Sequence, residues 1–578
     1  MPAIPVNFSR SLITFSILSE GELVPSSVGV VSISVVKEIN RIPYAKVVLQ
    51  DGNVSKQDFP ISNEKYFIPG KKIEIKAGYN SDEATIFKGI IIKQGIKIQK
   101  NGNSTLTIDC KDEAVKMTIG RKSKYFYESS DSDVMEELIA TYSLGSNIES
   151  SNIIHPELVQ YRCTDWDFML TRTEVNGKIC MVNDGEITIQ KPDFEQEPIT
   201  ELSYGSNLRS FEACIDARDQ FNSVTAQAWD FGGQEMITAE AEEPSLPEWG
   251  NLENSDLAEV VNLSEFQLAH GGKANQEELQ AWADAQLLRN RMAKIQGKAT
   301  IQGVAEINAG NIISLEGVGE RFNGKLFVSA IRHQIYGGDW LTDIQLGCNP
   351  EWFTETYPVH QPKASGLFPA IQGLQIGLVT ELEGDPDGED RIQVRLPIIN
   401  TEEQGIWARV ASLDAGENRG AFFRPEIGDE VIIGFINDDP GEAVVLGMLN
   451  SSAKPAPLQG SNDNHEKGFF TRSEMKIHFN DDEESITISN ADGNTVEIKK
   501  AEINLMDSNN NEIKMNADGI SIISGKDIIL EATGNISMSS NQNIEASAGI
   551  NYNIEGSANV EIKAGAVNTI KGSLIKIN

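Results

Sequence analysis

The stretch TGNISMSSNQNIEASAGINYNIEGSANVEIKAG, residues 533–565, belongs to a repeat of eight residues that begins at Ala517. In each block the fourth and sixth places are mostly apolar, and the third place usually holds Gly, Asp or Asn. Side chains two residues apart point to the same face of a strand, and Gly, Asp and Asn accept turn geometry. The pattern therefore predicts a repeat in which each block is one short strand followed by one corner.

The fourth and sixth places supply the predicted interior of this repeat. They are Ile520, Ile522, Ile528, Leu530, Ile536, Met538, Ile544, Tyr552, Ile554, Val560 and Ile562. One block is not stable by itself, because ordering each residue costs about 1–2 kcal/mol of backbone entropy and each buried aliphatic side chain returns only about 1.5–3 kcal/mol. A single chain coiled with three blocks per turn would complete only about two and a half turns. The arrangement that we favour has three chains, each supplying one wall of a triangular prism.

Apolar residues with the same i, i+2 spacing continue upstream of the repeat. Examples are Ile486 with Ile488 and Ile503 with Leu505. Polar turns such as NDDEES and DSNNNE separate these sets. We therefore expect the rod to begin near Phe469 with longer corners and to tighten toward the C-terminus.

The composition of the 578-residue chain is typical of a soluble multidomain protein. Its 85 acidic and 49 basic residues give a net charge of −36, which argues against binding nucleic acid or anionic membranes by charge. No stretch approaches the roughly 20 apolar residues of a membrane span, and the N-terminus lacks the pattern of a secretory signal. Five cysteines are scattered without metal-ligand spacing and are expected to be reduced thiols in a protein made in the cytoplasm.

The N-terminal part is rich in strand patterns, with a hairpin expected at Asn101-Gly102. A helix is expected over DSDVMEELIATYS, from Asp131, and another over ANQEELQAWADAQLLRNRMAKIQG, with Gly297 as the residue that ends it. The apolar stripe of the second helix would contain Trp282, Ala285, Leu288, Met292 and Ile295. Two barrel-like subdomains are expected, since this part is too large for one core. Trp166 and Phe168 are interpreted as packing residues.

Between two proline-containing joints, alternating apolar strands and Gly-Asp-Pro turns predict a five-stranded barrel of the OB type. The residues that characterise this segment are Asp385, Arg391, Trp407, Arg409, Pro425, Glu426, Gly428 and Asp429. Together with their neighbours they resemble the barrel of VgrG-type spike proteins, which form the tips of type VI secretion and related phage-tail-like contractile injection systems. Ile398 departs from this resemblance, because many relatives carry an aromatic residue there. We expect Trp407 and Ile427 to maintain the barrel.

The resemblance implies a mainly β homotrimer with three parts. Residues 1–360 would form a base similar to a phage tail hub, residues 361–457 the OB barrel, and residues 458–578 an intertwined triple-stranded β-helix. The segments VVSISVVKEINRIPYAKVVLQDG and CTDWDFMLTRTEVNG are similar to the hub portion of the family.

The resemblance also implies a function. The trimer would join the tail tube to a puncturing tip and pierce the target envelope when the sheath contracts. Its partners would be two further copies, tail tube and baseplate proteins at the base, effector cargo, and a PAAR-repeat protein at the tip. Leu574, Ile575 and Ile577 are expected to meet that protein. The particle would act outside the producing cell or be delivered into the target cell, with only transient contact with its membrane.

The sequence predicts no catalytic, cofactor or metal site and no enzyme. The six histidines are dispersed, HEKGFF lacks the second histidine of a zinc protease helix, and DPDGED lacks the later ligands of an EF-hand. The alternative is a monomeric β-solenoid that acts as a carbohydrate-active enzyme or adhesin. It is disfavoured because Glu531, Glu545, Glu555 and Glu561 occupy different places in their blocks. Only about twenty residues separate barrel and repeat, too few for a catalytic domain.

Overall fold

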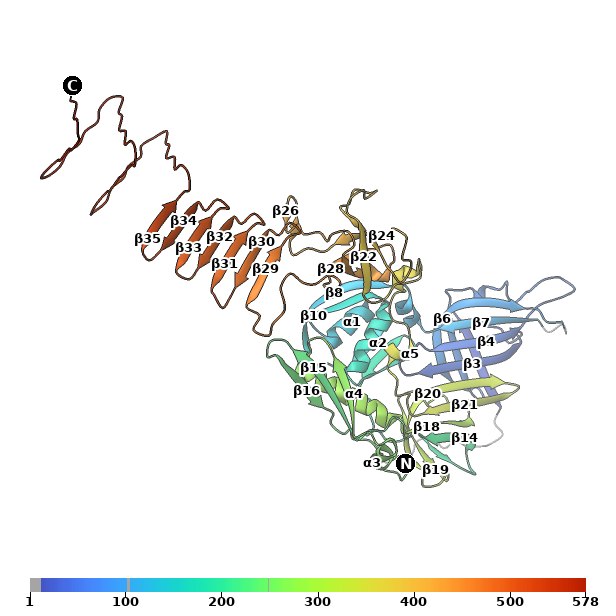
Figure 1. Ribbon diagram of the computed structural model, residues 1–578. Helices are drawn as coiled ribbons and strands as arrows, with labels where there is room; N and C mark the ends of the chain where they lie inside the picture. Colours follow the sequence, from blue (N-terminus) through green and yellow to red (C-terminus); the bar gives the residue numbers. More distant parts are fainter. Residues whose placement is uncertain (1–11, 101–103, 248, 578) are drawn as a thin grey trace. The chain divides into compact units, whose positions relative to one another are not determined.

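The computed structural model describes residues 12–100, 104–247 and 249–577 (Figure 1). The fold is mainly β, as predicted. One compact unit comprises Met1–Gly373 with Phe435–Glu442, and is called the head below. A second unit comprises Leu374–Gly434 with Ala443–Asn578 and contains both the barrel and the repeat. No helix in the described part of the chain is long and apolar enough to cross a membrane.

The head contains one sheet of thirteen strands with two separate apolar cores. Eleven of its strands follow one another in this spatial order: β14 (Leu208–Ile215), β18 (Ile295–Gln302), β21 (Asp339–Leu346), β20 (Gly324–Tyr336), β3 (Val30–Glu38), β4 (Tyr44–Gln50), β7 (Thr105–Lys111), β6 (Asp82–Lys97), β5 (Lys72–Tyr79), β1 (Ile13–Ser19) and β2 (Glu22–Leu23). The other two strands lie beside this path, where β19 (Ile312–Glu316) pairs with β20 and with β13 (Glu201–Ser203). Leu49, Ile75 and Ile108 lie in the first core, and Ile313 and Phe327 in the second. The expectation of two barrel-like subdomains stays a prediction, since both cores lie against one sheet and the head is one compact unit.

Helices and smaller sheets complete the head. A third core is formed by α1 (Asp131–Ala140), α2 (Asp165–Val175) and strands around them. The strands are β8 (Lys122–Ser130) with β10 (Ile154–Cys163), and β9 (Gly145–Ile148) with β11 (Ile179–Asn183) and β12 (Glu186–Gln190). Helix α4 (Gln276–Met292) packs on β15 (Ser223–Asp230), β16 (Glu235–Glu240) and β17 (Glu265–His270). Short helices are α3 (Asn254–Val261), α5 (Phe353–Thr356) and the 3₁₀ turns Lys65–Phe67, Glu113–Thr118, Lys363–Gly366 and Ile436–Asp438.

The predicted start of helix α4 agrees with the structure, but its predicted end does not. Helix α4 begins at Gln276 behind the N-cap Asn275, close to the predicted start, but it ends at Met292. The prediction that Gly297 ends the helix is wrong, because Ile295 and Gly297 belong to β18, where Gly297 pairs with Ala213 and Leu346.

The remaining expectations for the head concern packing and a turn. Trp166 is buried, and Phe168 stacks on Phe126 with ring centroids 5.9 Å apart, which confirms their packing role. The hairpin turn expected at Asn101-Gly102 lies outside the described residues.

The predicted five-stranded barrel is present and closed. Its strands are β22 (Gln375–Glu381), β23 (Ile392–Arg395), β24 (Ile406–Val410), β28 (Ala443–Met448) and β27 (Glu430–Phe435), with a small hairpin of β25 (Ala415–Gly416) and β26 (Arg419–Gly420) in the β24–β27 connection. Alternate residues point inward, so Val379, Val394, Ala408, Val431 and Val445 fill the interior.

The rod begins with a single-layer antiparallel sheet, called the wall below. Its seven strands follow each other in chain order: β29 (Glu466–Phe470), β30 (Lys476–Asn480), β31 (Ser485–Ser489), β32 (Thr495–Lys499), β33 (Glu502–Met506), β34 (Glu512–Asn516) and β35 (Gly519–Ile523). The start agrees with the expected beginning near Phe469. Residues 524–577, called the tail, form no strand within one chain (Figure 1). The predicted strand per block is therefore present in the first block only, as β35.

Candidate assembly surfaces

The barrel residues singled out from the sequence mainly stabilise turns. The Asp385 carboxylate accepts hydrogen bonds from the backbone N–H groups of Asp387, Glu389 and Arg391 at 2.8–3.2 Å, and Arg391 Nη2 donates to it at 2.6 Å. The Arg391 guanidinium and these N–H groups hold the pKa of Asp385 well below its ordinary value. The carboxylate thus fixes the turn before β23.

A second turn precedes β27. Asp429 accepts from the backbone N–H of Glu426 and from Lys454 Nζ, both at 2.8 Å, and Gly428 has a φ of +82° that suits glycine. Partial burial raises the pKa of Asp429, but Lys454 and the Glu426 N–H outweigh it, so the pKa lies below its ordinary value.

The other barrel residues lie apart from these turns. Trp407 and Arg409 flank the buried Ala408 on β24, where Trp407 is half-buried and Arg409 exposed. Pro425 is buried and Ile427 is 63% exposed. The expectation that Trp407 and Ile427 maintain the barrel stays a prediction. The signature residues therefore support the barrel at separate points and do not converge on one site.

Two contacts join the barrel to the first strands of the wall. Phe423 stacks on Phe469 with ring centroids 5.5 Å apart and an angle of 17° between the rings. Arg472 Nη1 donates to Glu426 Oε2 at 2.9 Å. Sequence reasoning missed these contacts, because residues 46 positions apart leave no local pattern.

One face of the wall is apolar and arranged in two rows across the strands. The first row is Phe469, Ile477, Ile488, Val496, Leu505, Ile513 and Ile522, and the second is Phe479, Ile486, Ile498, Ile503, Met515 and Ile520. Each member is the direct cross-strand partner of the next, the arrangement that stabilises a sheet most directly. All seven side chains of the first row line a groove of ≈ 900 Å³, which also contacts Phe423 and Ile528.

The opposite face of the wall is polar. Lys514 pairs with Glu502 at 2.7 Å and Lys499 with Glu497 at 3.1 Å. A second layer over the apolar face of such a single-layer sheet would remove these side chains from water and add stability. No segment of the described chain covers this face completely, since ten of the thirteen row members are at least 36% exposed and Ile486, Val496 and Met515 are half-buried.

The residues expected to form the interior of the repeat are exposed, both in β35 and in the tail. The eleven side chains from Ile520 to Ile562 are between 48% and 72% exposed in the single chain. The proposed tip residues Leu574, Ile575 and Ile577 are exposed as well. The chain alone therefore does not bury the interior that its repeat predicts.

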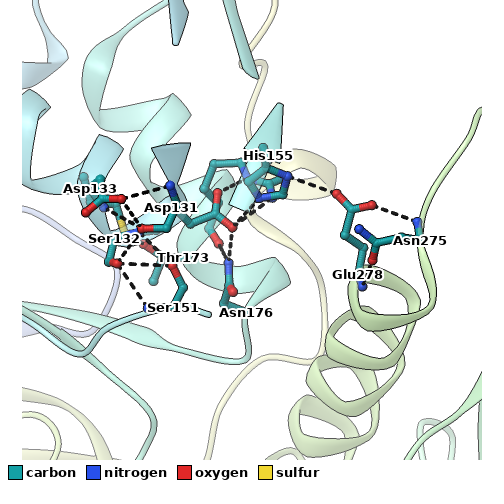
Figure 2. Close-up of polar contacts among 12 residues, drawn as sticks. Asp131, Ser132, Asp133, Ser151, His155, Thr173, Asn176, Asn275 and Glu278 are labelled. Atoms are coloured by element: carbon teal, nitrogen blue, oxygen red, sulfur yellow. Dashed lines mark hydrogen bonds and ion pairs between the residues drawn. The ribbon is translucent and has the colours of Figure 1, made fainter. Parts of the chain in front are cut away.

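The head contains a buried polar cluster (Figure 2). Asp131 at the start of α1 accepts from Arg172 Nε at 2.6 Å and from Asn176 Nδ2 at 2.8 Å, and its Oδ2 lies 3.2 Å from His155 Nε2. His155 Nδ1 lies 3.1 Å from Glu278 Oε1 on α4. Burial raises the pKa of Asp131, but Arg172 outweighs it and the pKa is lowered.

This cluster connects α1, α2, β10 and α4 through hydrogen bonds and ion pairs inside the head. Ser132, the adjacent hydroxyl, bonds to Ser130 and Ser151 instead of His155 (Figure 2). Both oxygens of Asp131 are occupied by Arg172. A nucleophile–base–carboxylate series is therefore not formed there. Within the described residues, no group of three or more His, Cys, Asp or Glu side chains has the geometry to hold a metal ion.

Comparison with known families identifies the two main parts of the chain. Residues 9–337 match the Alg8 N-terminal domain, over more than half of the sequence. The chain belongs to the Alg8 N-terminal domain family. Residues 375–449 match the type VI secretion system/phage-baseplate injector OB domain. This second match coincides with the closed barrel and confirms the resemblance to VgrG-type spike proteins.

Similar solved structures are remote in sequence. The 43 kDa tail protein of prophage MuSo2 from Shewanella oneidensis is 10% identical, with a TM-score of 0.45, over 58% of this chain and 98% of that one. A chain of the Francisella PdpA–VgrG complex is 11% identical, with a TM-score of 0.40, over 89% and 88%. The c3393 protein of E. coli, a component of the type VI secretion system, is 11% identical, with a TM-score of 0.38, over 75% and 99%. No curated protein matches the chain.

Proposed function

We propose that the protein is the homotrimeric hub and spike at the tip of a contractile injection system, where it joins the tail tube to a tip that pierces the target envelope. The observation that carries this proposal is an injector-type OB barrel followed directly by a wall and a tail whose apolar side chains lack a second layer. Further copies of the chain would cover these side chains.

Three copies fit the wall better than two. Each wall presents two parallel rows of apolar side chains on one face. In a triangular prism every wall meets two neighbours, so each row contacts the facing row of an adjacent wall around a closed threefold axis. The polar face with its Lys514–Glu502 pair then lies outside, in water. Each aliphatic side chain buried in this way contributes about 1.5–3 kcal/mol.

The work of such a trimer is mechanical. A prism in which three chains share backbone hydrogen bonds does not bend or separate without breaking contacts to both neighbours, so it transmits an axial force to a small area. The barrels would form a collar, the head would meet tail tube and baseplate proteins, and effector cargo would travel with the assembly. Leu574, Ile575 and Ile577 would form the apolar end that meets a PAAR-repeat tip protein.

Size-exclusion chromatography with light scattering tests the trimer directly. We expect a species of three times the chain mass of 63.3 kDa. A monodisperse species at the chain mass would overturn the proposal and favour the monomeric solenoid. Electron microscopy of native particles then tests the position: density for the trimer is expected at the end of the tube that leads into the target.

A further inference from the structure

The rod has two parts that differ in where their backbone partners lie. Every strand of the wall pairs with a neighbour from the same chain, whereas the tail forms no strand within the chain. We propose that the wall is a preformed docking unit for a second copy of the chain, and that the tail takes up its strands only after three walls have met. This inference rests on the proposed trimer and adds the surface at which it starts.

The wall meets the requirements for folding before association. Its strands follow one another in sequence and are joined by short turns, so each closure costs little chain entropy. Cross-strand pairs such as Ile488 with Val496 and Leu505 with Ile513 fix its register. The Phe423–Phe469 stack and the Arg472–Glu426 ion pair attach its beginning to the barrel. One chain therefore presents the apolar face already ordered.

The groove along the first row indicates what covers the face. All seven side chains of that row line it, and no side chain of the second row does. Polar side chains such as Asn490, Asn494 and Asp507 also line the groove. The apolar part of the complementary surface is therefore a row of apolar side chains at strand spacing, which the second row of another wall provides. First row against second row is a head-to-tail contact, and three such contacts close around a threefold axis. The occupant of the groove is thus a second copy of the chain.

The tail, unlike the wall, is expected to become ordered only after association. Most of its blocks offer two apolar places, and its residues from Asp527 onward lie in no strand of the single chain. If a single tail became ordered, it would lose conformational entropy while its backbone N–H and C=O groups gained no hydrogen-bond partners. Once three walls are docked, three tails begin from the same height, which gives them a high effective concentration for one another. Ordering then proceeds from Ser524 toward the tip.

Two variants of the full protein separate this order of events from the alternatives. The first ends after Ser524 and lacks the tail. The second is Leu505→Asp, which puts a charge into the groove. Its matched control is Asn504→Asp, one residue earlier, on the polar face beside Lys514. Light scattering over a dilution series measures the mass of each, and near-ultraviolet circular dichroism checks that the head remains folded.

We expect trimers for the full chain, for the chain ending at Ser524 and for Asn504→Asp, and monomers with a folded head for Leu505→Asp. The milder Leu505→Ala is expected to raise the concentration of half-dissociation at least tenfold. A monomer for the shortened chain beside a full-length trimer would show that the tail drives assembly and would overturn the inference, while the proposed trimer would stand. A trimer for Leu505→Asp would equally overturn it. A monomeric full-length chain would refute both proposals.

Discussion

Phe423 and Phe469 stack at 5.5 Å between their ring centroids, and this pair connects a loop of the barrel to the first strand of the wall. Neither ring is deeply buried, since Phe423 is 59% and Phe469 48% exposed. The pair lies at the barrel end of the apolar groove. It therefore holds the beginning of the rod at a defined place on the barrel.

A double-mutant cycle on Phe423→Ala and Phe469→Ala measures this connection. We expect a coupling free energy of about 0.5–1.5 kcal/mol, as for other aromatic pairs. Equilibrium unfolding of the four proteins provides the values. Phe422→Ala is the control, because this neighbouring ring is exposed and does not stack on Phe469. Strict additivity of the two substitutions would contradict the predicted contact.

The buried side chain of His333 is expected to make the head less stable in acid. Its ring is buried with Nδ1 3.0 Å from Thr342 Oγ1, and burial lowers its pKa from 6.5 to about 3. Because the unfolded state binds the proton more tightly, the stabilising contribution is complete above pH 6.5 and is lost as the pH falls toward 3. The loss is at most about 1.4 kcal/mol per pH unit.

Urea unfolding of the protein and of His333→Gln from pH 7 to pH 4 tests this dependence. The difference in unfolding free energy between the two proteins should shrink as the pH falls. A difference that stays constant over this range would show that His333 is not the group responsible.

Asp131 is expected to be critical for the head. Asp131→Ala leaves Arg172 without its buried carboxylate partner, and breaking such a pair costs about 3–5 kcal/mol. Asp133→Ala is a matched control in the same helical turn, where it removes the two hydrogen bonds that the Asp133 carboxylate accepts from the Ser130 N–H and hydroxyl and costs about 1 kcal/mol. Thermal unfolding of both variants measures the difference. Equal losses would contradict a special role of the buried cluster.

The cysteines should differ in reactivity toward a thiol reagent at neutral pH. Cys214 is exposed, whereas Cys110 and Cys180 are buried. Burial raises the pKa of Cys348 to about 12 and raises those of Cys110 and Cys180 further above the ordinary value. Partial burial also raises the pKa of the half-buried Cys163. Since the thiolate is the reactive species, we expect one fast thiol, lost in Cys214→Ser, and slow reaction of the rest until denaturant is added. Several fast thiols in the folded variant would contradict this.

The sequence by itself determined the features that depend on short spacing. The i, i+2 apolar places predicted the strands of the wall and the start of the rod near Phe469, because alternation along a strand is a local property. The Gly and Asp residues of the barrel, among them Gly428, marked turns for the same reason. The prediction of a five-stranded barrel rested on these turns together with the alternating apolar strands.

Only the tertiary structure decided which of these elements meet. It placed Gly297 in a strand where helical periodicity had extended the helix, because pairing with β14 and β21 outweighs a local signal. It joined Asp131, His155 and Glu278 from three separate elements, and Arg472 with Glu426 across 46 residues. It also showed that one chain completes the wall yet leaves its apolar face bare. Contacts of this kind depend on the path of the whole chain in space, which the spacing of neighbouring residues in the sequence does not specify.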